Sequence, residues 1–406
     1  MKKEFKQPGI GRIPKEWAVV KVRDVGEVIT GTTPSTKITE YWGEGYPFVT
    51  PTDFSDSKYV YETERSVTLK GAKAARLIPK DSVMVTCIAS VGEVSMAAKE
   101  CITNQQINTI VCNEKTNPYY IYYIMAFKKN DLRRWAGITT SPIIKKSLFE
   151  EFPLPLPPLP EQKKIAEILG TVDKAIEKVE QAIEKADRLK KGLMQELLTK
   201  GIGHKEFKES EIGRIPKEWE VVKLGDKDVS NLIIGQSPPS STYNKKGEGL
   251  PFLQGKAEFG EIHPTPLLYC SRPIKIAEKN DVLLSVRAPV GDVNIASLKS
   301  CIGRGLTAIR PKNNRLYYLY LFYYLIFKKR VFKSLSTGST FKAIRRSEIE
   351  NYLIPLPSLP EQQKIAEILD TVDKRLEVLK AKKQKFERIK KGLMNDLLTG
   401  RKRVKV

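Results

Sequence analysis

Histidine and cysteine side chains are the first candidates for chemistry, and this chain has few of them. Neither His204 nor His263 stands in a spacing that suits metal ligation or activation of a nucleophile. The 5 cysteines form no CxxC pair and their number is odd, which indicates neither a zinc site nor a disulfide framework. We therefore expect no metal site, and the reduced cysteines favour a cytoplasmic location.

Nucleotide-binding and methyl-transfer motifs are also missing. No GxxxxGK[ST] loop is present, and no GxGxxG follows a predicted strand. Asn117-Pro118-Tyr119-Tyr120 is similar to the Asn-Pro-Pro-Tyr motif of adenine methyltransferases, but the second proline is absent and no glycine-rich loop precedes it. The corresponding place in the second half reads Asn314-Arg315-Leu316-Tyr317. Asn-Pro here is more typical of a helix start.

Charge and length indicate binding to a polyanion by more than one folded unit. The 70 Lys and Arg residues exceed the 47 Asp and Glu residues, giving a net charge of +23. Such an excess favours nucleic acid, because basic side chains displace the counterions condensed on phosphates. A basic surface that binds nothing is the alternative. A chain of 406 residues is long enough for two or three domains, and its longest apolar run is too short to span a membrane.

The chain is a tandem duplication with an offset of roughly 200 residues. EFKQPGIGRIPKEW at Glu4 returns as EFKESEIGRIPKEW at Glu206, and PLPPLPEQKKIAEIL at Pro155 returns as PLPSLPEQQKIAEIL at Pro355. LKKGLMQELLTK at Leu189 matches IKKGLMNDLLTG at Ile389. The intervening stretches have diverged, which predicts a common framework with variable content.

Each divergent stretch is expected to form a sheet with strands turning at Gly92 and Gly291. An aromatic segment follows in each half, PYYIYYIMAFKKNDLRRWA in the first and LYYLYLFYYLIFKKRVFKSL in the second. Its apolar spacing predicts a helix packed on the sheet, with a base-stacking platform as the alternative.

Two long helices are predicted after the proline-rich LPPLPEQ and LPSLPEQ segments. Their apolar residues recur at steps of three and four, which is typical of a coiled-coil seam. A pseudo-twofold relation between the halves would make the helices antiparallel; the alternative is that each helix folds back on its own domain. The predicted seam comprises Ile165, Leu169, Val172, Ile176, Val179, Ile183, Leu193, Leu197, Ile365, Leu369, Val372, Leu376, Leu379, Phe386, Leu393 and Leu397.

This order of variable domain, repeated helix, variable domain and repeated helix resembles the specificity subunit of type I restriction-modification systems over essentially the whole chain. The motifs that carry the resemblance are the paired framework segments and the domain openings GTTPSTKITEYWGEGYPFVTPTDF and GQSPPSSTYNKKGEGLPFLQGKAEF. The resemblance implies that each variable domain reads one half of a split site on double-stranded DNA, while the helices space the halves and bind methyltransferase subunits.

We expect an α+β fold with two similar mixed domains and two long antiparallel helices. The predicted boundaries are residues 1–157 and 201–357 for the target recognition domains, and 158–200 and 358–406 for the helical regions. The resemblance implies two methyltransferase subunits and further restriction or translocase subunits as partners. S-adenosylmethionine, ATP and magnesium are expected in those partners, with no cofactor and no catalytic residue in this chain.

Side-chain chemistry in the divergent stretches predicts the candidate DNA contacts. Arginine and the amides can pair with base edges, whereas lysine and hydroxyl groups more often anchor phosphates. For each of these residues the alternative is an ordinary solvated surface residue or turn former. The base-contact candidates are Gln105, Gln106, Gln254, Arg287 and Arg304. The phosphate-contact candidates are Thr32, Thr33, Ser35, Lys37, Lys145, Lys146, Ser237, Ser240, Lys245, Lys256, Lys342, Arg345 and Arg346.

Two functions from other classes stay open at this point. One is a nuclease or methyltransferase whose site lacks a motif, such as a pair of carboxylates holding a metal ion. The other is a scaffold whose helices bind partners and whose positive charge is incidental; its affinity for DNA would depend little on salt.

Overall fold

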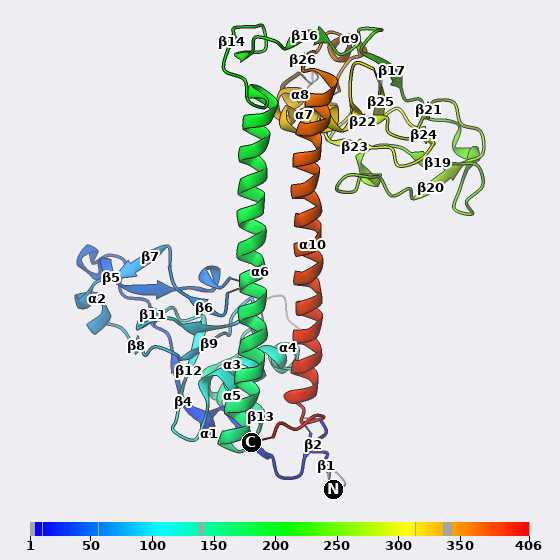
Figure 1. Ribbon diagram of the computed structural model, residues 1–406. Helices are drawn as coiled ribbons and strands as arrows, with labels where there is room; N and C mark the ends of the chain where they lie inside the picture. Colours follow the sequence, from blue (N-terminus) through cyan, green and yellow to red (C-terminus); the bar gives the residue numbers. More distant parts are fainter. Residues whose placement is uncertain are drawn as a thin grey trace. The chain divides into compact units, whose positions relative to one another are not determined.

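The computed structural model describes residues 5–9, 11–55, 57–137, 142–312, 314–335 and 343–405 (Figure 1). The chain divides into two compact units: unit 1 comprises Met1–Glu180 and Ala381–Val406, and unit 2 comprises Gln181–Lys380. Each unit therefore contains one globular domain, a segment from the start of one long helix and a segment from the end of the other.

The helices and strands of unit 1 follow one another along a single globular domain before the first long helix begins. They are β1 (Phe5–Lys6), β2 (Ile13–Pro14), β3 (Ala18–Lys21), α1 (Val22–Val25), β4 (Gly26–Thr30), η1 (Thr39–Tyr41), β5 (Trp42–Val49), η2 (Pro51–Asp53), β6 (Tyr59–Val60), β7 (Arg65–Val67), α2 (Leu69–Lys73), β8 (Leu77–Ile78), β9 (Val83–Thr86), β10 (Val94–Ala97), β11 (Cys101–Thr103), β12 (Ile107–Cys112), α3 (Pro118–Phe127), α4 (Lys129–Trp135), α5 (Lys146–Glu150), β13 (Pro153–Leu156) and α6 (Leu159–Lys200).

Unit 2 follows a similar order, although its described residues form no helices at the places of α1 and α2. Its elements are β14 (Phe207–Lys208), β15 (Ile215–Pro216), β16 (Glu220–Lys223), β17 (Ser230–Ile234), η3 (Ser240–Thr242), β18 (Tyr243–Asn244), β19 (Leu250–Leu253), η4 (Lys256–Glu258), β20 (Leu268–Cys270), β21 (Ile276–Ala277), β22 (Val282–Ser285), β23 (Val293–Ile295), β24 (Ser300–Ile302), β25 (Leu306–Pro311), α7 (Tyr318–Phe327), α8 (Lys329–Leu335), α9 (Arg346–Glu350), β26 (Leu353–Leu356) and α10 (Leu359–Leu397).

Two sheets of four or five strands form the centre of each globular domain, in addition to two two-stranded sheets. In unit 1 their strand orders are β4-β12-β9-β10-β6 and β7-β5-β11-β8. In unit 2 the corresponding orders are β17-β25-β22-β23 and β18-β20-β19-β24-β21. The predicted turns at Gly92 and Gly291 are confirmed, since both glycines have φ of 87° and follow β9 and β22. The predicted α+β fold with two similar domains and two long helices is confirmed.

The aromatic helices α3 and α7 are core elements, as predicted. Tyr120, Tyr123, Tyr320 and Tyr323 are fully buried, because α3 packs between a long helix and the sheet that contains β9, and α7 between a long helix and the sheet that contains β22. Asn117 caps α3, its side chain accepting a hydrogen bond from the Tyr120 amide.

The predicted equivalence between Asn117 and Asn314 is wrong. The backbone amides of Asn117 and Tyr317 both donate to a glutamine at the start of a long helix, Gln162 at 2.9 Å and Gln362 at 2.8 Å. Tyr317 therefore takes the place of Asn117, because the approach to α7 is longer than the sequence comparison suggested.

A tyrosine, an aspartate and a lysine join each domain to both helix segments of its unit. In unit 1 the Tyr123 hydroxyl donates to Asp173 of α6 at 2.5 Å, and Lys390 of α10 lies 2.7 Å from the same carboxylate. A second ion pair joins Glu180 to Lys383, so the helix segments of unit 1 run antiparallel. These contacts fix the register of the two segments.

The same group recurs in unit 2. The Tyr323 hydroxyl donates to Asp373 of α10 at 3.0 Å, and Lys190 of α6 lies 2.5 Å from that carboxylate. Apolar contacts between Ala186, Val372 and Leu376 continue the pairing along the helices. The duplicated sequence thus produces a duplicated junction.

The predicted seam residues fall into two environments. Those near the helix ends join the domain cores: Ile165, Leu169, Leu393 and Leu397 in unit 1, and Ile365, Leu369, Leu193 and Leu197 in unit 2. Those nearer the middle of α10 in unit 2 pack across the helix pair with Ile183, namely Val372, Leu376 and Leu379. In unit 1, Val179 is buried, and Val172, Ile176 and Phe386 are half-buried.

Membrane insertion finds no support in the helices. Within the described part of the chain, none combines the length and apolarity that crossing a bilayer requires.

Candidate nucleic-acid interface

The ends of three neighbouring strands lie side by side at one end of the five-stranded sheet in unit 1. The pairing is antiparallel, with Asn108 of β12 opposite Thr30 of β4, and Ile107 of β12 opposite Thr86 of β9. The carboxyl ends of β4 and β9 therefore flank the amino end of β12. The connections that leave these ends share one surface of the domain.

Backbone hydrogen bonds fasten these connections to one another. The Gly31 amide donates to the Ile107 carbonyl at 3.0 Å, and the Thr32 amide to the Thr103 carbonyl at 2.8 Å. A Cβ on Gly31 would lie 2.1 Å from the Asn104 carbonyl oxygen, so only glycine permits this approach. The Ile144 amide adds the next segment by donating to the Cys87 carbonyl at 2.8 Å. We call residues 31–38, 86–92, 103–107 and 142–146 the strand-end surface of unit 1.

All predicted contacts of the first domain lie within these segments. Gln105 is exposed, and its Oε1 accepts a hydrogen bond from the Thr33 hydroxyl at 2.6 Å. Thr32 and Gln106 are half-buried beside them. The exposed residues Ser35 and Lys37 follow on the same loop, and the exposed Lys145 precedes α5. Lys146 points its ammonium to Glu150 of α5 at 3.6 Å.

The four-stranded sheet of unit 2, β17-β25-β22-β23, has strand ends arranged in the same way. Thr307 of β25 lies opposite Ile234 of β17, and Leu306 lies opposite Ser285 of β22. The Gly235 amide donates to the Leu306 carbonyl at 2.9 Å, and a Cβ on Gly235 would lie 2.1 Å from the Gly303 carbonyl oxygen. We call residues 235–240, 285–291, 302–306 and 343–346, with Gln254, the strand-end surface of unit 2.

Gln254, Arg287 and Arg304 are brought together here from three separate connections. All three are exposed. The parallel pairing of β19 with β24 places Gln254 beside the turn that carries Arg304, with the Gln254 Cα 3.1 Å from the Cβ position of Gly303. Ser237 accepts a hydrogen bond from the Arg304 amide at 3.2 Å. The edge of unit 2 thus presents two guanidinium groups and an amide.

The phosphate candidates of the second domain are more scattered. Ser240 and Arg345 are exposed at the ends of the surface, whereas Lys245 lies on the connection between β18 and β19. Lys256 forms an ion pair with Asp292 at 2.9 Å, and Arg346 donates to Glu350 at 2.6 Å. Lys342 lies outside the described residues.

Sequence reasoning missed two polar residues of these surfaces. Gln236 follows Gly235 and is exposed, at the place that Thr32 occupies in unit 1. Comparison of GTTP with GQSP in the two domain openings could have found it. Arg76 donates to the Thr30 carbonyl at 2.8 Å and so adds a cation at the end of β4. No sequence signal pointed to Arg76, because it comes from the region before β8.

The chemical groups gathered at these edges are hydrogen-bonding amides, hydroxyls and cations. Burial raises the pKa of the Cys87 thiol to about 12, which makes it a poor nucleophile at neutral pH. Across the described ranges, His, Cys, Asp and Glu form no cluster of three or more suited to a metal ion. The arrangement is suited to binding phosphates and base edges.

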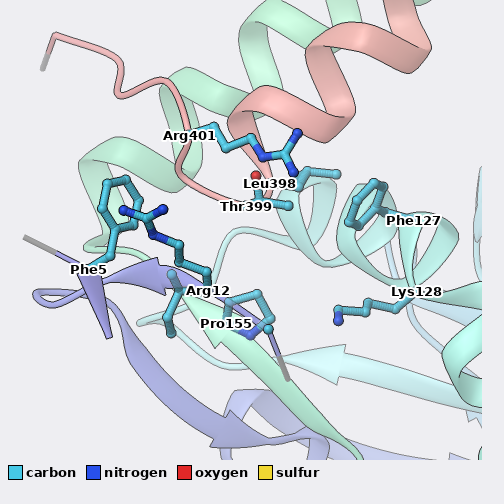
Figure 2. Close-up of a pocket in the computed structure, with 10 residues that line it drawn as sticks. Phe5, Arg12, Phe127, Lys128, Pro155, Leu398, Thr399 and Arg401 are labelled. Atoms are coloured by element: carbon cyan, nitrogen blue, oxygen red, sulfur yellow. The ribbon is translucent and has the colours of Figure 1, made fainter. Parts of the chain in front are cut away.

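A cavity of about 420 Å³ in unit 1 lies where the β1–β2 hairpin, the end of α3 and the turn after α10 meet (Figure 2). Phe5, Phe127 and Leu398 line it, and the Arg12 guanidinium stacks 4.4 Å from the centre of the Phe5 ring. None of its lining residues belongs to the strand-end surface. The cavity is therefore a feature of the framework and not of the candidate interface.

A protein-family model matches the chain twice, once in each half. A family model described as the type I restriction modification DNA specificity domain matches residues 14–186 and again residues 216–388. The chain belongs to this family. Each match begins at the first strands of one domain and ends within its long helix, so each unit contains most of one family domain.

Similar specificity subunits cover the chain from end to end. A putative type I restriction enzyme MjaX specificity subunit of Methanocaldococcus jannaschii is 41% identical, with 99% of this chain and 97% of the relative aligned. The MjaVIII specificity subunit of the same organism is 31% identical over 99% of this chain and 96% of its own length.

Solved structures show the same fold. A chain from a study of complex assembly and conformational transition of the type I R-M system is 28% identical, with a TM-score of 0.60 over 96% of this chain and 99% of that one. A type I restriction-modification S subunit from M. genitalium has a TM-score of 0.62 at 17% identity, over 98% of this chain and 99% of that one. The latter similarity supports the fold alone.

Proposed function

We propose that this chain is the DNA-recognising specificity subunit of a type I restriction-modification enzyme. Each strand-end surface would read one half of a split site in double-stranded DNA. The observation that carries the proposal is the repetition of one backbone edge in both units with different exposed side chains, such as Gln105 in unit 1 and Arg304 in unit 2. A duplicated frame with unlike side chains suits two unlike half-sites.

The remaining candidates take roles that follow from their chemistry. Gln105, Gln106, Gln254, Arg287 and Arg304 would contact bases, while the hydroxyl and lysine candidates would anchor phosphates. The net charge of +23 supports this, since phosphate contacts give most of the affinity for DNA. Lys256, Lys146 and Arg346 would have to exchange their carboxylate partners for phosphate.

We infer that two methyltransferase subunits bind the long helices. Leu189 is 55% exposed and Ile389 is 40% exposed, and both precede the repeated KKGLM segment. Equivalent apolar side chains in both units support two like partners. Restriction or translocase subunits would join the full complex. S-adenosylmethionine, ATP and magnesium would act in these partners, and the whole would serve as adenine methyltransferase and ATP-dependent endonuclease in the cytoplasm.

The test is to co-express the chain with its cognate methyltransferase subunit and to map methylated adenines across the host genome. We expect a two-part motif with a fixed gap. Replacing the divergent stretch 26–112 with that of a related subunit should change one half of the motif and leave the other. Scattered or continuous sites would overturn the proposal.

The two alternatives have their own measurements. A scaffold with incidental charge would bind DNA with little salt dependence, whereas we expect affinity to fall steeply between 50 and 200 mM salt, by about 10³-fold or more. Methyl transfer or DNA nicking by the purified chain alone, with S-adenosylmethionine and magnesium, would show that it is itself an enzyme.

A further inference from the structure

The turns that follow β11 and β24 correspond differently in structure and in sequence. Aligning the repeated Cys-Ile pairs, Cys101-Ile102 with Cys301-Ile302, would place Gln105 opposite Gly305. Strand pairing gives another register: Thr103 of β11 pairs with Val49, and Ile302 of β24 pairs with Leu253 in the same parallel manner. Thr103 therefore corresponds to Ile302, one residue away from the sequence alignment.

Backbone hydrogen bonds confirm this register on both sides of the turn. On one side, the Asn104 amide donates to the Val49 carbonyl at 3.0 Å, and the Gly303 amide to the Leu253 carbonyl at 2.8 Å. On the other side, the carbonyls of Gln106 and Gly305 accept from Cys87 at 2.7 Å and Val286 at 2.9 Å.

The middle residue of each three-residue turn is then Gln105 in unit 1 and Arg304 in unit 2. Both are exposed. A hydroxyl from the neighbouring loop contacts each one: Thr33 donates to the Gln105 side chain at 2.6 Å, and Ser237 accepts from the Arg304 backbone amide at 3.2 Å. The backbone of the turn is therefore the same in both units, and its exposed side chain differs.

These two residues also differ in the base that each can pair with in two hydrogen bonds. A glutamine amide matches N6 and N7 of adenine, whereas a guanidinium matches O6 and N7 of guanine. Thr33 occupies one lone pair of the Gln105 Oε1 and leaves the second lone pair and both Nε2 hydrogens for a base. The Ser237 contact uses only the backbone of Arg304, so the guanidinium is not engaged by it.

We propose that this one position, Gln105 in unit 1 and Arg304 in unit 2, is an interchangeable reading position that determines one base of each half-site. Gln105 reads adenine and Arg304 reads guanine. This assignment rests on the proposed function, because it names the specificity-determining residue within the DNA interface.

The experiment exchanges the two side chains within the full chain. Arg304→Gln and Gln105→Arg are each co-expressed with the methyltransferase subunit, and the methylated motif is mapped. Arg304→Gln should change one base of one half-site from guanine to adenine, and Gln105→Arg should change one base of the other half-site from adenine to guanine. Loss of a two-hydrogen-bond contact corresponds to a preference change on the order of 10- to 100-fold.

The charge-matched control for Arg304→Gln is Lys279→Gln in unit 2, and Lys80→Gln is a surface control in unit 1. These lysines are exposed at the turns that lead into β9 and β22. They therefore lie at the opposite ends of these strands from the reading position. Lys279→Gln removes the same charge as Arg304→Gln. Both controls should leave every base of the motif unchanged.

Binding selection from a randomised duplex library is the second measurement, because it reads the motif without catalysis and covers a variant that no longer supports methylation. A variant that is folded by circular dichroism and selects the wild-type motif overturns the inference, as does a change in both half-sites. Failure of the wild-type chain to give any two-part motif overturns the proposed function instead. The two failures are therefore distinguishable.

Discussion

The contacts that join each domain to its long helices are the same in the two units, whereas the exposed side chains of the strand-end surfaces differ. At the junctions the same residue types make the same contacts, as in Tyr123 with Asp173 and Tyr323 with Asp373. At the strand ends the backbone contacts are kept and the exposed side chains differ. Side chains that fix the fold cannot change without leaving a buried partner unsatisfied, whereas those that face solvent are free to vary.

A second junction shows how the framework tolerates a change of partner. Trp17 donates to Glu161 at 3.1 Å in unit 1, and Trp219 donates to Glu361 at 3.0 Å in unit 2. The remaining acceptor capacity of Glu161 is used by Arg403, in two hydrogen bonds of 2.7 and 2.9 Å. Glu361 instead accepts from the His204 ring at 2.8 Å and from the Ile202 amide at 3.0 Å. What matters is that the carboxylate is satisfied.

The largest expected effect comes from breaking the tyrosine, aspartate and lysine junction. Asp173→Ala leaves the buried Tyr123 hydroxyl and the Lys390 ammonium without this carboxylate, and should lower the free energy of unfolding by about 3 kcal/mol. Asp373→Ala should cost less, about 2 kcal/mol, because its hydrogen bond to tyrosine is longer and its side chain is more exposed, at 12% against 8%. Urea denaturation followed by circular dichroism measures both.

Glu184→Ala is the control for the helix itself. Glu184 pairs with Arg188 one turn away on the exposed side of α6, at 2.5 Å, and its loss should cost no more than about 0.5 kcal/mol. Equal losses for Asp173→Ala and Glu184→Ala would show that the junction adds no more stability than a surface pair.

The next effect compares the two carboxylate partners. Arg403→Ala removes two of the hydrogen bonds to the buried Glu161 and should cost about 2 kcal/mol. His204→Ala should cost about 1 kcal/mol, since the Ile202 amide and Trp219 still donate to Glu361. Thermal unfolding of both variants tests the order, and a larger loss for His204→Ala would refute it. Arg403→Lys should fall between Arg403→Ala and the parent chain.

The sequence predicted the framework well, because its repeated motifs and apolar spacing correspond to residues that are buried in the structure. Repeated motifs gave the two domains, and the aromatic segments are the core helices. Sequence could not give the correspondence between Gln105 and Arg304, because aligning the identical Cys-Ile pairs differs by one residue from the register of the strands. It also could not show that Gln254 lies beside Arg304, since parallel pairing of β19 with β24 joins residues distant in the chain. Lys256 looked suitable for phosphate, but its pairing with Asp292 depends on tertiary structure.

Alkaline pH should sharpen the comparison through the buried thiols. Burial raises the pKa of Cys101 to about 12 in unit 1 and that of Cys301 to about 11 in unit 2. In the unfolded chain these thiols ionise near pH 8.5. Each buried thiol therefore contributes its full share to the free energy of unfolding below about pH 8.5. Above that pH the unfolded thiol ionises first, so the free energy of unfolding falls as pH rises toward the folded pKa, by about 2 kcal/mol at pH 10 for a thiol such as Cys101.

The measurement is the slope of unfolding free energy against pH from 8 to 10 for Cys101→Ala beside the parent chain. The variant should lose stability less steeply with pH, whatever its stability at pH 7. Cys112, whose pKa burial also raises to about 12, provides a second site, and Cys112→Ala should flatten the slope by a similar amount. Parallel slopes for parent and variants would mean that these thiols are not protected from ionisation.

The smallest expected effect concerns one lysine contact between the variable segment and a helix in each unit. In unit 2 Lys380 of α10 lies 2.6 Å from Glu261, and both side chains are substantially exposed, so Glu261→Gln should cost less than about 1 kcal/mol. In unit 1 the variable segment instead places Lys58 over aromatic residues of α3, with its ammonium 5.4 Å from the centre of the Tyr119 ring and 5.9 Å from that of Tyr123. Burial lowers the pKa of Lys58, while nearby Asp173 opposes that shift. Because salt screens exposed charges more than buried ones, 0.5 M NaCl should abolish the effect of Glu261→Gln and leave that of Lys58→Met. Equal salt sensitivity in the two variants would mean that both contacts are simple surface pairs.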